Sequence, residues 1–188
     1  MPAPPNRRLV VLDRDGVINR ESPDFIRSPA DWVPLPGSIE AIGELTRAGF
    51  TVLVASNQSG VGRGLFSAGT LAAIHGRMTA AIEAAGGRLG GIYVCPHRPE
   101  DGCDCRKPRP GLLRQIAAEF GEPLAGVPVI GDSWRDLEAA WAVGARAILV
   151  RTGNGASAEA RLRNGAGAEA EVYTDLAAAA RALVADPR

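Results

Sequence analysis

Two aspartates near the start of the chain have the type and spacing that phosphoryl chemistry and metal binding require. Asp13 and Asp15 flank Arg14 and follow the short apolar run Leu9–Leu12. If that run is a strand, its period of two places both carboxylates on one side and directs Arg14 away. Two such carboxylates repel, so they favour Mg²⁺ or a shared proton. An aspartate can also attack phosphorus to form an aspartyl phosphate, while a second carboxyl serves as acid and then base. The alternative is a surface loop with a helix-capping aspartate.

Two later segments carry donors and a cation that suit a phosphate group. Ser56 and Asn57, followed by glycines at 60, 62 and 64, offer hydroxyl, amide and backbone N–H donors, although such a segment could be only a turn. Lys107 lies in the proline-containing run 106–110, whose stiff backbone limits where the ammonium group can go. There it could neutralise a phosphoryl group during transfer. The alternative is a solvated basic run.

A third aspartate, Asp132, follows the apolar run Val127–Ile130. It could complete a Mg²⁺ site with Asp13 and the backbone carbonyl of Asp15. Asp136 stands three residues after Ser133, which is the spacing of a capping box at the start of a helix. The sequence therefore leaves open whether Asp136 only caps that helix or also takes part in catalysis.

All three cysteines of the chain gather beside one of its two histidines, in the order Cys95, His97, Cys103 and Cys105. An odd number of cysteines within one short loop is a poor disulfide framework and a good metal framework. Three thiolates and one imidazole form the donor set of a closed, tetrahedral Zn²⁺ site. We expect a structural zinc that orders the loop 95–105 and so positions Lys107; the alternative is three reduced, unpaired thiols.

Short β-branched runs alternate with segments of helical periodicity, a pattern typical of an α/β domain with a parallel sheet. Strands are predicted at Leu9–Leu12, Phe50–Ala55, Ile92–Val94, Val127–Ile130, Ala147–Val150 and Glu171–Tyr173. Helices are predicted from Ser38 to Gly49, Ser67 to Gly86, Pro110 to Gly121 and Trp134 to Val143, and after Asp175. The segments Asn19–Pro36 and Asn154–Ala168 are expected to be loops. Four polar clusters follow strands, and ligands of open parallel sheets bind at that edge.

The composition limits the class of protein. The chain has 188 residues, with 21 Lys and Arg balanced by 21 Asp and Glu. Zero net charge disfavours binding to nucleic acids or anionic membranes, and no apolar stretch approaches a membrane span. The segment 1–8 leads into the first strand without a signal peptide. We expect a single cytoplasmic domain over 1–188 that is monomeric and acts on a small phosphorylated molecule.

Taken in order, these motifs resemble those of the haloacid-dehalogenase (HAD) superfamily of aspartyl-phosphate phosphatases. The segments 13–19, 56–64 and 95–111 look like those of its members that act on heptose 1,7-bisphosphates, in the histidinol-phosphatase-like branch. The resemblance covers about Leu9 to Val150. It implies a three-layer, Rossmann-like fold with helices on both faces of a parallel sheet and no large cap domain. The zinc loop and the segment Asn19–Pro36 would then form the walls of the pocket.

The resemblance also implies a role for each residue. Asp13 would be the nucleophile and Asp15 the acid and base, with Asp132 as a Mg²⁺ ligand. Ser56 and Lys107 would steady the transferred phosphoryl group. The substrate would be contacted by Arg14, Glu21, Ser22, Asp24, Asn57, Gln58, Ser59, Arg106 and Ser133.

The implied reaction is Mg²⁺-dependent removal of the 7-phosphate from a heptose bisphosphate, in the synthesis of nucleotide-activated heptose. Histidinol-phosphate phosphatases share the catalytic set and a similar zinc loop, so hydrolysis of histidinol phosphate is the nearest alternative. A non-catalytic, zinc-stabilised module that binds phosphorylated ligands is the remaining one. It would have no need for two carboxylates beside a phosphate, because they repel it unless a metal intervenes.

Overall fold

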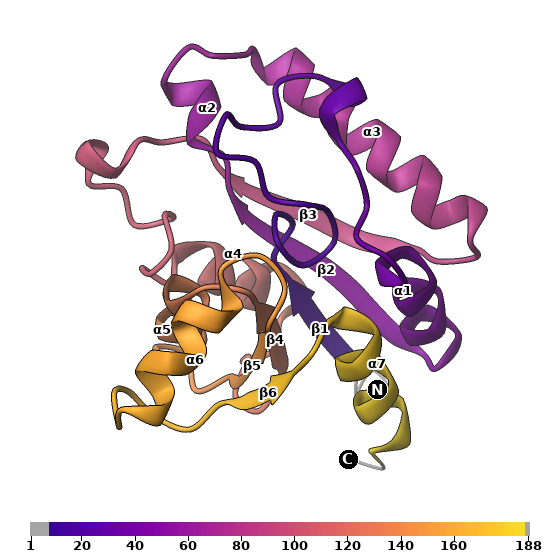
Figure 1. Ribbon diagram of the computed structural model, residues 1–188, viewed down its shortest axis with the longest axis vertical. Helices are drawn as coiled ribbons and strands as arrows, with labels where there is room; N and C mark the ends of the chain where they lie inside the picture. The colour runs from indigo at the N-terminus through magenta and orange to yellow at the C-terminus, as the bar shows by residue number, and fades with distance from the viewer. Residues whose placement is uncertain (1–7, 187–188) are drawn as a thin grey trace.

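The computed structural model describes residues 8–186. The expectation that the chain starts without a signal peptide concerns residues 1–8, most of which lie outside the described residues. Six parallel strands form one sheet in the order β3-β2-β1-β4-β5-β6 (Figure 1). The strands are β1 Arg8–Leu12, β2 Phe50–Asn57, β3 Leu89–Cys95, β4 Pro128–Gly131, β5 Arg146–Val150 and β6 Glu171–Tyr173. The order reverses beside β1, so β1 and its neighbours β2 and β4 end at the switch point where α/β sheets bind ligands.

Helices cover both faces of this sheet. One face carries α1 Ser38–Arg47, α3 Ala68–Ala84 and α7 Leu176–Ala185, and the other carries α4 Gly111–Phe120, α5 Trp134–Trp141 and α6 Gly155–Arg163. Strand β1 shows why two cores form: Val10 and Leu12 pack with the first set of helices, and Leu9 and Val11 with the second. The predicted three-layer α/β fold is confirmed.

The segments beyond the carboxyl ends of the strands are small. The segment Asn19–Pro36 contains only a 3₁₀ turn at Pro29–Asp31, and the predicted zinc loop contains another at Pro99–Asp101. Neither builds a cap domain over the sheet. Within the described part of the chain, every helix falls short of the length and apolar character needed to cross a membrane.

Four details of the secondary structure differ from the predictions. Residues Gly155–Arg163 form α6, where a loop was expected. The helix was not predicted because only Gly155 and Ala158 are buried, so no apolar stripe marks it in the sequence. A short helix, α2, spans Ser59–Gly62. Strand β3 begins at Leu89, earlier than expected. Ser38, a residue type typical of N-caps and the one expected to cap α1, is instead its first residue: the N-cap is Gly37, and the Ser38 hydroxyl donates to the carbonyl oxygens of Ile18 and Leu35.

Candidate active site

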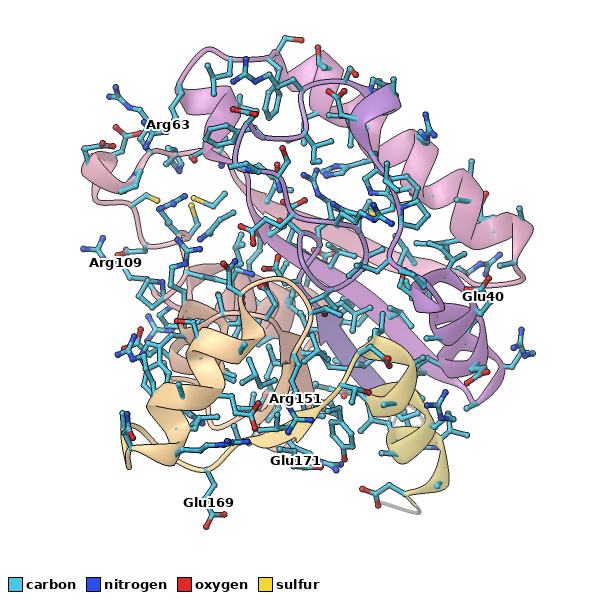
Figure 2. All side chains as sticks on the ribbon, in the orientation of Figure 1. Glu40, Arg63, Arg109, Arg151, Glu169 and Glu171 are labelled. Atoms are coloured by element: carbon cyan, nitrogen blue, oxygen red, sulfur yellow. The ribbon has the colours of Figure 1, made fainter. Side chains whose placement is uncertain are left out.

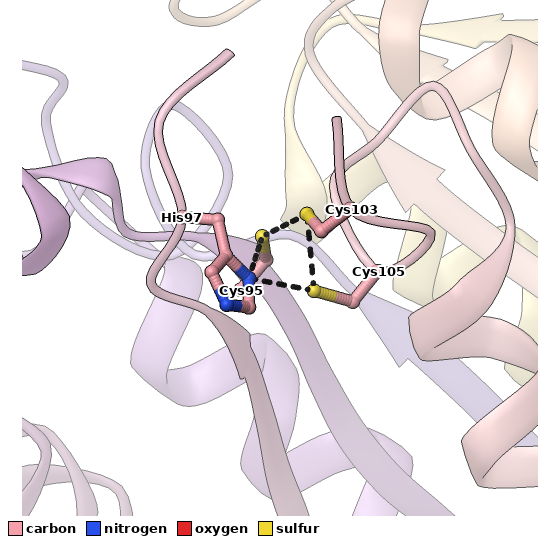
Figure 3. Close-up of side chains that lie close together, drawn as sticks. All are labelled: Cys95, His97, Cys103 and Cys105. Atoms are coloured by element: carbon pink, nitrogen blue, oxygen red, sulfur yellow. Dashed lines mark hydrogen bonds between the residues drawn. The ribbon is translucent and has the colours of Figure 1, made fainter. Parts of the chain in front are cut away.

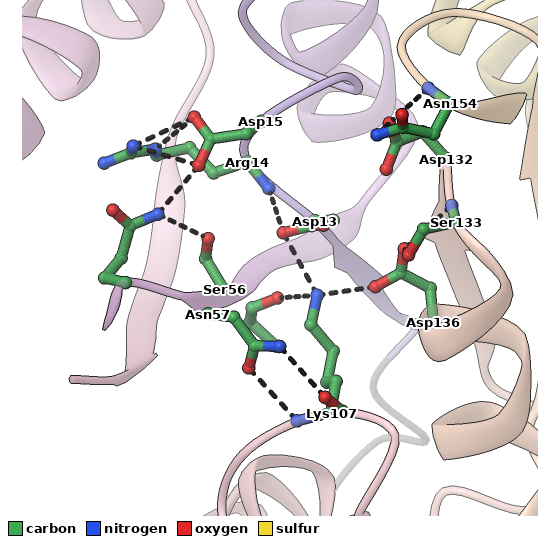
Figure 4. A network of polar contacts seen from close by, with 12 residues as sticks. Asp13, Arg14, Asp15, Ser56, Asn57, Lys107, Asp132, Ser133, Asp136 and Asn154 are labelled. Carbon is green, nitrogen blue, oxygen red and sulfur yellow. Dashed lines mark hydrogen bonds and ion pairs between the residues drawn. The ribbon is translucent and has the colours of Figure 1, made fainter. Parts of the chain in front are cut away.

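The polar clusters that follow β1, β2, β3 and β4 meet at one edge of the sheet. A small cleft of about 70 Å³ opens there, and every predicted catalytic residue lines it together with the neighbouring aspartates (Figure 4). Its lining consists of Asp13, Asp15, Glu21, Ser56, Asn57, Lys107, Asp132, Ser133, Arg135 and Asp136. We call it the inner cleft. The parallel register brings these residues together, since the backbone N–H of Asp13 donates to Ile130 of β4 directly beside the site.

Lys107 is the central cation of the inner cleft and is only 5% exposed. Its Nζ lies 3.0 Å from Asp13 Oδ1 and 2.6 Å from Asp136 Oδ1, and it donates to the carbonyl oxygen of Ala55 at 2.8 Å. Burial by itself would lower the pKa of Lys107, but the two carboxylates outweigh it and raise that pKa. The amine is therefore held as an ammonium ion, aimed at the oxygen of the predicted nucleophile.

Asn57 fixes the backbone that carries Lys107. Its Nδ2 donates to the carbonyl oxygen of Lys107 at 3.0 Å, and its Oδ1 accepts from the N–H of Lys107 at 3.1 Å. The amide thus pairs with Lys107 as a neighbouring strand would. Asn57 lines the cleft, as predicted for a substrate contact, but its side-chain donor and acceptor already bind the protein.

The Asp15 carboxylate is surrounded by N–H donors. Arg14 donates to both of its oxygens at 2.9 and 3.0 Å, Asn19 donates to Oδ1 at 2.9 Å and Gln58 to Oδ2 at 2.8 Å. The same Gln58 nitrogen contacts Ser56 Oγ at 2.8 Å. The sequence-based expectation that Arg14 points away from Asp15 is wrong. The strand ends at Leu12, so the alternation of a strand no longer applies and the buried guanidinium folds back onto the carboxylate.

Three carboxylates, those of Asp13, Asp132 and Asp136, have oxygen atoms within 4.8 Å of one another. Burial is the main cause that raises the pKa of Asp13 to about 7 and that of Asp132 to about 8, and repulsion from neighbouring carboxylates adds to it. Oxygen atoms of this type are the donors that Mg²⁺ takes, and a cation would relieve the repulsion. The donor set therefore fits a magnesium ion. Asp15 is outside this carboxylate cluster; its backbone carbonyl remains the predicted contact.

Asp136 caps a helix and also contacts Lys107. Its Oδ2 accepts from the Ser133 N–H at 3.0 Å and from the Ser133 hydroxyl at 2.5 Å, which completes the capping box of α5. Its Oδ1 forms the ion pair with Lys107, and that charge outweighs burial and lowers the pKa of Asp136. The helix cap and the ion pair with Lys107 thus share one buried carboxylate.

A larger cleft of about 410 Å³ continues from the inner one, because Asp15, Glu21, Asn57 and Arg135 line both. We call it the outer cleft. The segment that contains Glu21 forms one wall and the Cys/His loop another, as expected. Of the residues predicted to contact substrate, Arg14, Glu21, Ser22, Asn57, Gln58, Ser59 and Arg106 line the outer cleft, and Ser133 lines the inner one. Asp24 is exposed and lines neither cleft.

Two arginines of the outer cleft were missed in the sequence. Arg63, labelled in Figure 2, stands at the end of α2. Its Nη2 lies 4.0 Å from Oε1 of Glu100 in the Cys/His loop. Arg135, in the first turn of α5, is exposed and makes no hydrogen bond or ion pair within residues 8–186. Together with Arg106 they make the mouth of the cleft basic. Neither stands out in the sequence, because Arg63 lies inside the glycine-rich run 60–64 and Arg135 inside the capping box of α5.

The four predicted zinc ligands converge (Figure 3). The Sγ atoms of Cys95 and Cys103 are 3.5 Å apart, those of Cys103 and Cys105 are 3.4 Å apart, and His97 Nδ1 lies 3.2 Å from Cys105 Sγ and 3.7 Å from Cys95 Sγ. Ligand atoms around a tetrahedral Zn²⁺ with bonds of about 2.3 Å are separated by about 3.5–3.8 Å. The donor set and its spacing therefore fit zinc.

Comparisons with known proteins agree with this geometry. The family model of the HAD-hydrolase-like proteins matches residues 104–180. A D-glycero-beta-D-manno-heptose-1,7-bisphosphate 7-phosphatase from Pseudomonas putida is 50% identical over 177 residues, which are 94% of this chain and 99% of the relative. The crystal structure of a D,D-heptose 1,7-bisphosphate phosphatase from Bordetella bronchiseptica, complexed with magnesium and phosphate, is similar with a TM-score of 0.90 and 50% identity, covering 94% and 98% of the two chains. A Burkholderia thailandensis phosphatase of the same description is similar with a TM-score of 0.75 and 42% identity, over 96% and 100%.

Proposed function

The chain belongs to the family of the D-glycero-beta-D-manno-heptose-1,7-bisphosphate 7-phosphatases within the HAD hydrolases, and on that premise we propose that it removes the 7-phosphate of this bisphosphate. The observation that carries the proposal is the inner cleft, where Asp13, Lys107 and Asp132 meet at the ends of three strands. We propose the β anomer as substrate, since the curated relatives are named for it. The product would enter the synthesis of nucleotide-activated heptose in the cytoplasm.

In the first step a carboxylate oxygen of Asp13 attacks the phosphorus atom. The bond between phosphorus and the sugar oxygen breaks, Asp15 gives that oxygen a proton, and an aspartyl phosphate remains. In the second step Asp15 takes a proton from water, the water oxygen attacks phosphorus, and the Asp13 carboxylate and free phosphate are released. Lys107 and Ser56 flank the phosphoryl group and stabilise the charge on its oxygens.

Two metal ions would support these steps. Magnesium would be held by Asp13 and Asp132 with the Asp15 carbonyl, where it supplies positive charge beside the phosphoryl group. Its place is supported by the carboxylate cluster and by the magnesium in the B. bronchiseptica structure. Zinc would be held by Cys95, His97, Cys103 and Cys105, a closed set with no position left for substrate, so its role would be structural.

The outer cleft would hold the rest of the sugar and its second phosphate. Arg135 and Arg106 line it; the guanidinium of Arg135 makes no hydrogen bond or ion pair within residues 8–186, and that of Arg106 uses one nitrogen, Nη1, to donate to the carbonyl oxygen of His97 at 3.2 Å. Arginine binds phosphate through two parallel hydrogen bonds. A substrate with phosphates at both ends would thus contact Lys107 at one end and these arginines at the other. A monophosphate would leave both arginines without a phosphate to bind, which favours the bisphosphate over histidinol phosphate.

The test is phosphate release in Mg²⁺ from the β and α anomers of heptose 1,7-bisphosphate and, in parallel, from histidinol phosphate. We expect kcat/KM for the β-bisphosphate to exceed that for histidinol phosphate by orders of magnitude. Asp13→Asn, which keeps the size of the side chain, should abolish turnover while the melting curve stays that of a folded protein. Preference for histidinol phosphate would contradict the substrate assignment, and unchanged turnover of the variant in a clean preparation would contradict the nucleophile.

A further inference from the structure

Asn154 lies between two acidic residues that come from distant parts of the chain. It follows β5, and its backbone N–H donates to Asp132 Oδ2 at 2.8 Å (Figure 4). Its side-chain Nδ2 lies 3.3 Å from the same Asp132 oxygen and also donates to Glu21 Oε2. One amide therefore joins a predicted magnesium ligand to a residue that lines both clefts.

The backbone on both sides of Asn154 allows this segment to lie close to Asp132. A Cβ at Gly153 would overlap the carboxylate of Asp132, and a Cβ at Gly155 would overlap the carbonyl oxygen of Val150. Gly153 also has a positive φ of 58°, which side-chain-bearing residues rarely adopt. Just before it, the Thr152 hydroxyl donates to the carbonyl oxygen of Gly16 at 2.6 Å. The β5–α6 connection is thus seated on the two loops that carry the predicted magnesium ligands.

We infer that Asn154 is a positioning residue that fixes the Asp132 carboxylate for the cation and ties the Glu21 wall of the clefts to it. Without the amide, the carboxylates of Glu21 and Asp132 would face each other with no donor between them, and repulsion would displace the less constrained of the two. Glu21 is exposed and sits on a segment without regular secondary structure, so it is the one that would move. The part of this inference that concerns substrate rests on the proposed function; the part that concerns the cation does not.

The first experiment measures Mg²⁺ binding to the full chain by titration calorimetry, without substrate. Asn154→Ala should weaken Mg²⁺ binding roughly tenfold, since it removes one hydrogen bond to a charged group while the backbone donor remains. Asn164→Ala is the matched control, because Asn164 is an exposed asparagine that ends the same helix α6. Asn154 is itself exposed, so we expect both metal-free variants to melt like the wild type. Equal Mg²⁺ affinity in the two variants would overturn the inference.

The second experiment tests the link to Glu21 with a double-mutant cycle of Glu21→Ala and Asn154→Ala. If one amide serves both carboxylates, the losses of Mg²⁺ affinity should fall short of additivity by threefold or more. At saturating Mg²⁺, Asn154→Ala should recover kcat to within about threefold of the wild type while KM for the bisphosphate stays raised. Additive losses would refute the bridge. A wild type that hydrolyses no sugar bisphosphate would refute the proposed function, whereas the binding cycle would still decide the role of Asn154.

Discussion

Substitution of Asp136 by asparagine separates a helix cap from a catalytic support, because the change keeps the shape of the side chain and alters only its hydrogen bonding. The carboxylate accepts on both oxygens: Oδ2 from the N–H and hydroxyl of Ser133, and Oδ1 from Lys107. An amide has one acceptor oxygen and one NH₂ group. Whichever way the asparagine turns, either the Ser133 N–H or the Lys107 ammonium faces a donor.

The size of the effect follows from that count. A buried donor left without an acceptor costs ~1–3 kcal/mol, and removal of one partner from a buried ion pair costs ~3–5 kcal/mol. The second figure applies at its low end, because Lys107 keeps Asp13 at 3.0 Å and the carbonyl oxygen of Ala55 at 2.8 Å. We expect a loss of about 2–4 kcal/mol in the free energy of unfolding, which lowers the Tm of a chain of this length by roughly 5–15 °C. Because Lys107 is no longer centred between two carboxylates, kcat should fall roughly 100-fold.

The assay is urea unfolding and steady-state kinetics of the variant beside Ser133→Ala. That control removes only the hydroxyl that donates to Asp136 and leaves the Lys107 ion pair, so its loss of stability should be about 1 kcal/mol. If Asp136→Asn loses no more stability than Ser133→Ala and keeps the kcat of the wild type, then Asp136 is a helix cap alone and the reasoning is refuted.

Two further predictions concern the metal sites. The Cys103→Ser variant, or treatment with a chelator, should lower the zinc content below one atom per chain and reduce activity. The far-UV circular dichroism spectrum should stay nearly unchanged, since the cluster lies in a loop. Full activity without zinc would contradict a structural role of the metal. In the metal-free protein, burial raises the pKa of Asp13 to about 7 and of Asp132 to about 8, so between about pH 4 and 8 the native state holds more protons than the unfolded chain and its stability falls as the pH rises. Mg²⁺ must displace those protons. Its stabilising shift in Tm should therefore be larger at about pH 8.5 than at about pH 5.5, and equal shifts would show that the carboxylates do not hold the cation.

The sequence predicts the parts of this molecule whose physical signal is local. Strands and helices with an apolar stripe stand where their periodicity places them, and α3 and α7 begin directly after Ser67 and Asp175, whose side chains cap them. Helix α6 was not predicted because its two buried residues, Gly155 and Ala158, produce no periodic apolar pattern. Its formation depends on tertiary contacts, which no window of the sequence contains.

In the candidate site, too, the sequence predicts residues with a local signal and misses those whose position depends on the tertiary fold. The residue types and spacings of the Asp-x-Asp pair, the Cys/His loop and Lys107 indicate phosphoryl transfer and metal binding when they are taken together. Arg135 and Asn154 do not, since an isolated arginine or asparagine is ordinary in any surface segment. The roles proposed for them depend on where the fold places them. Asn154, for example, donates to Glu21, which lines the cleft and lies more than a hundred positions earlier in the chain.

The Cys/His cluster is connected to Lys107, the predicted catalytic lysine, through the end of β2. Cys95 ends β3 in register with Asn57, and its carbonyl oxygen accepts from the Gln58 N–H at 2.7 Å. Cys105, in the same cluster, stands two residues before Lys107, whose backbone pairs with the Asn57 side chain. The cluster therefore closes a loop whose two ends, at Cys95 and at Lys107, both form hydrogen bonds with residues at the end of β2. A metal bound by the cluster would reduce the conformational freedom of the segment that carries Lys107. It would then act on the proposed reaction only by positioning Lys107, at a distance from the phosphorus atom.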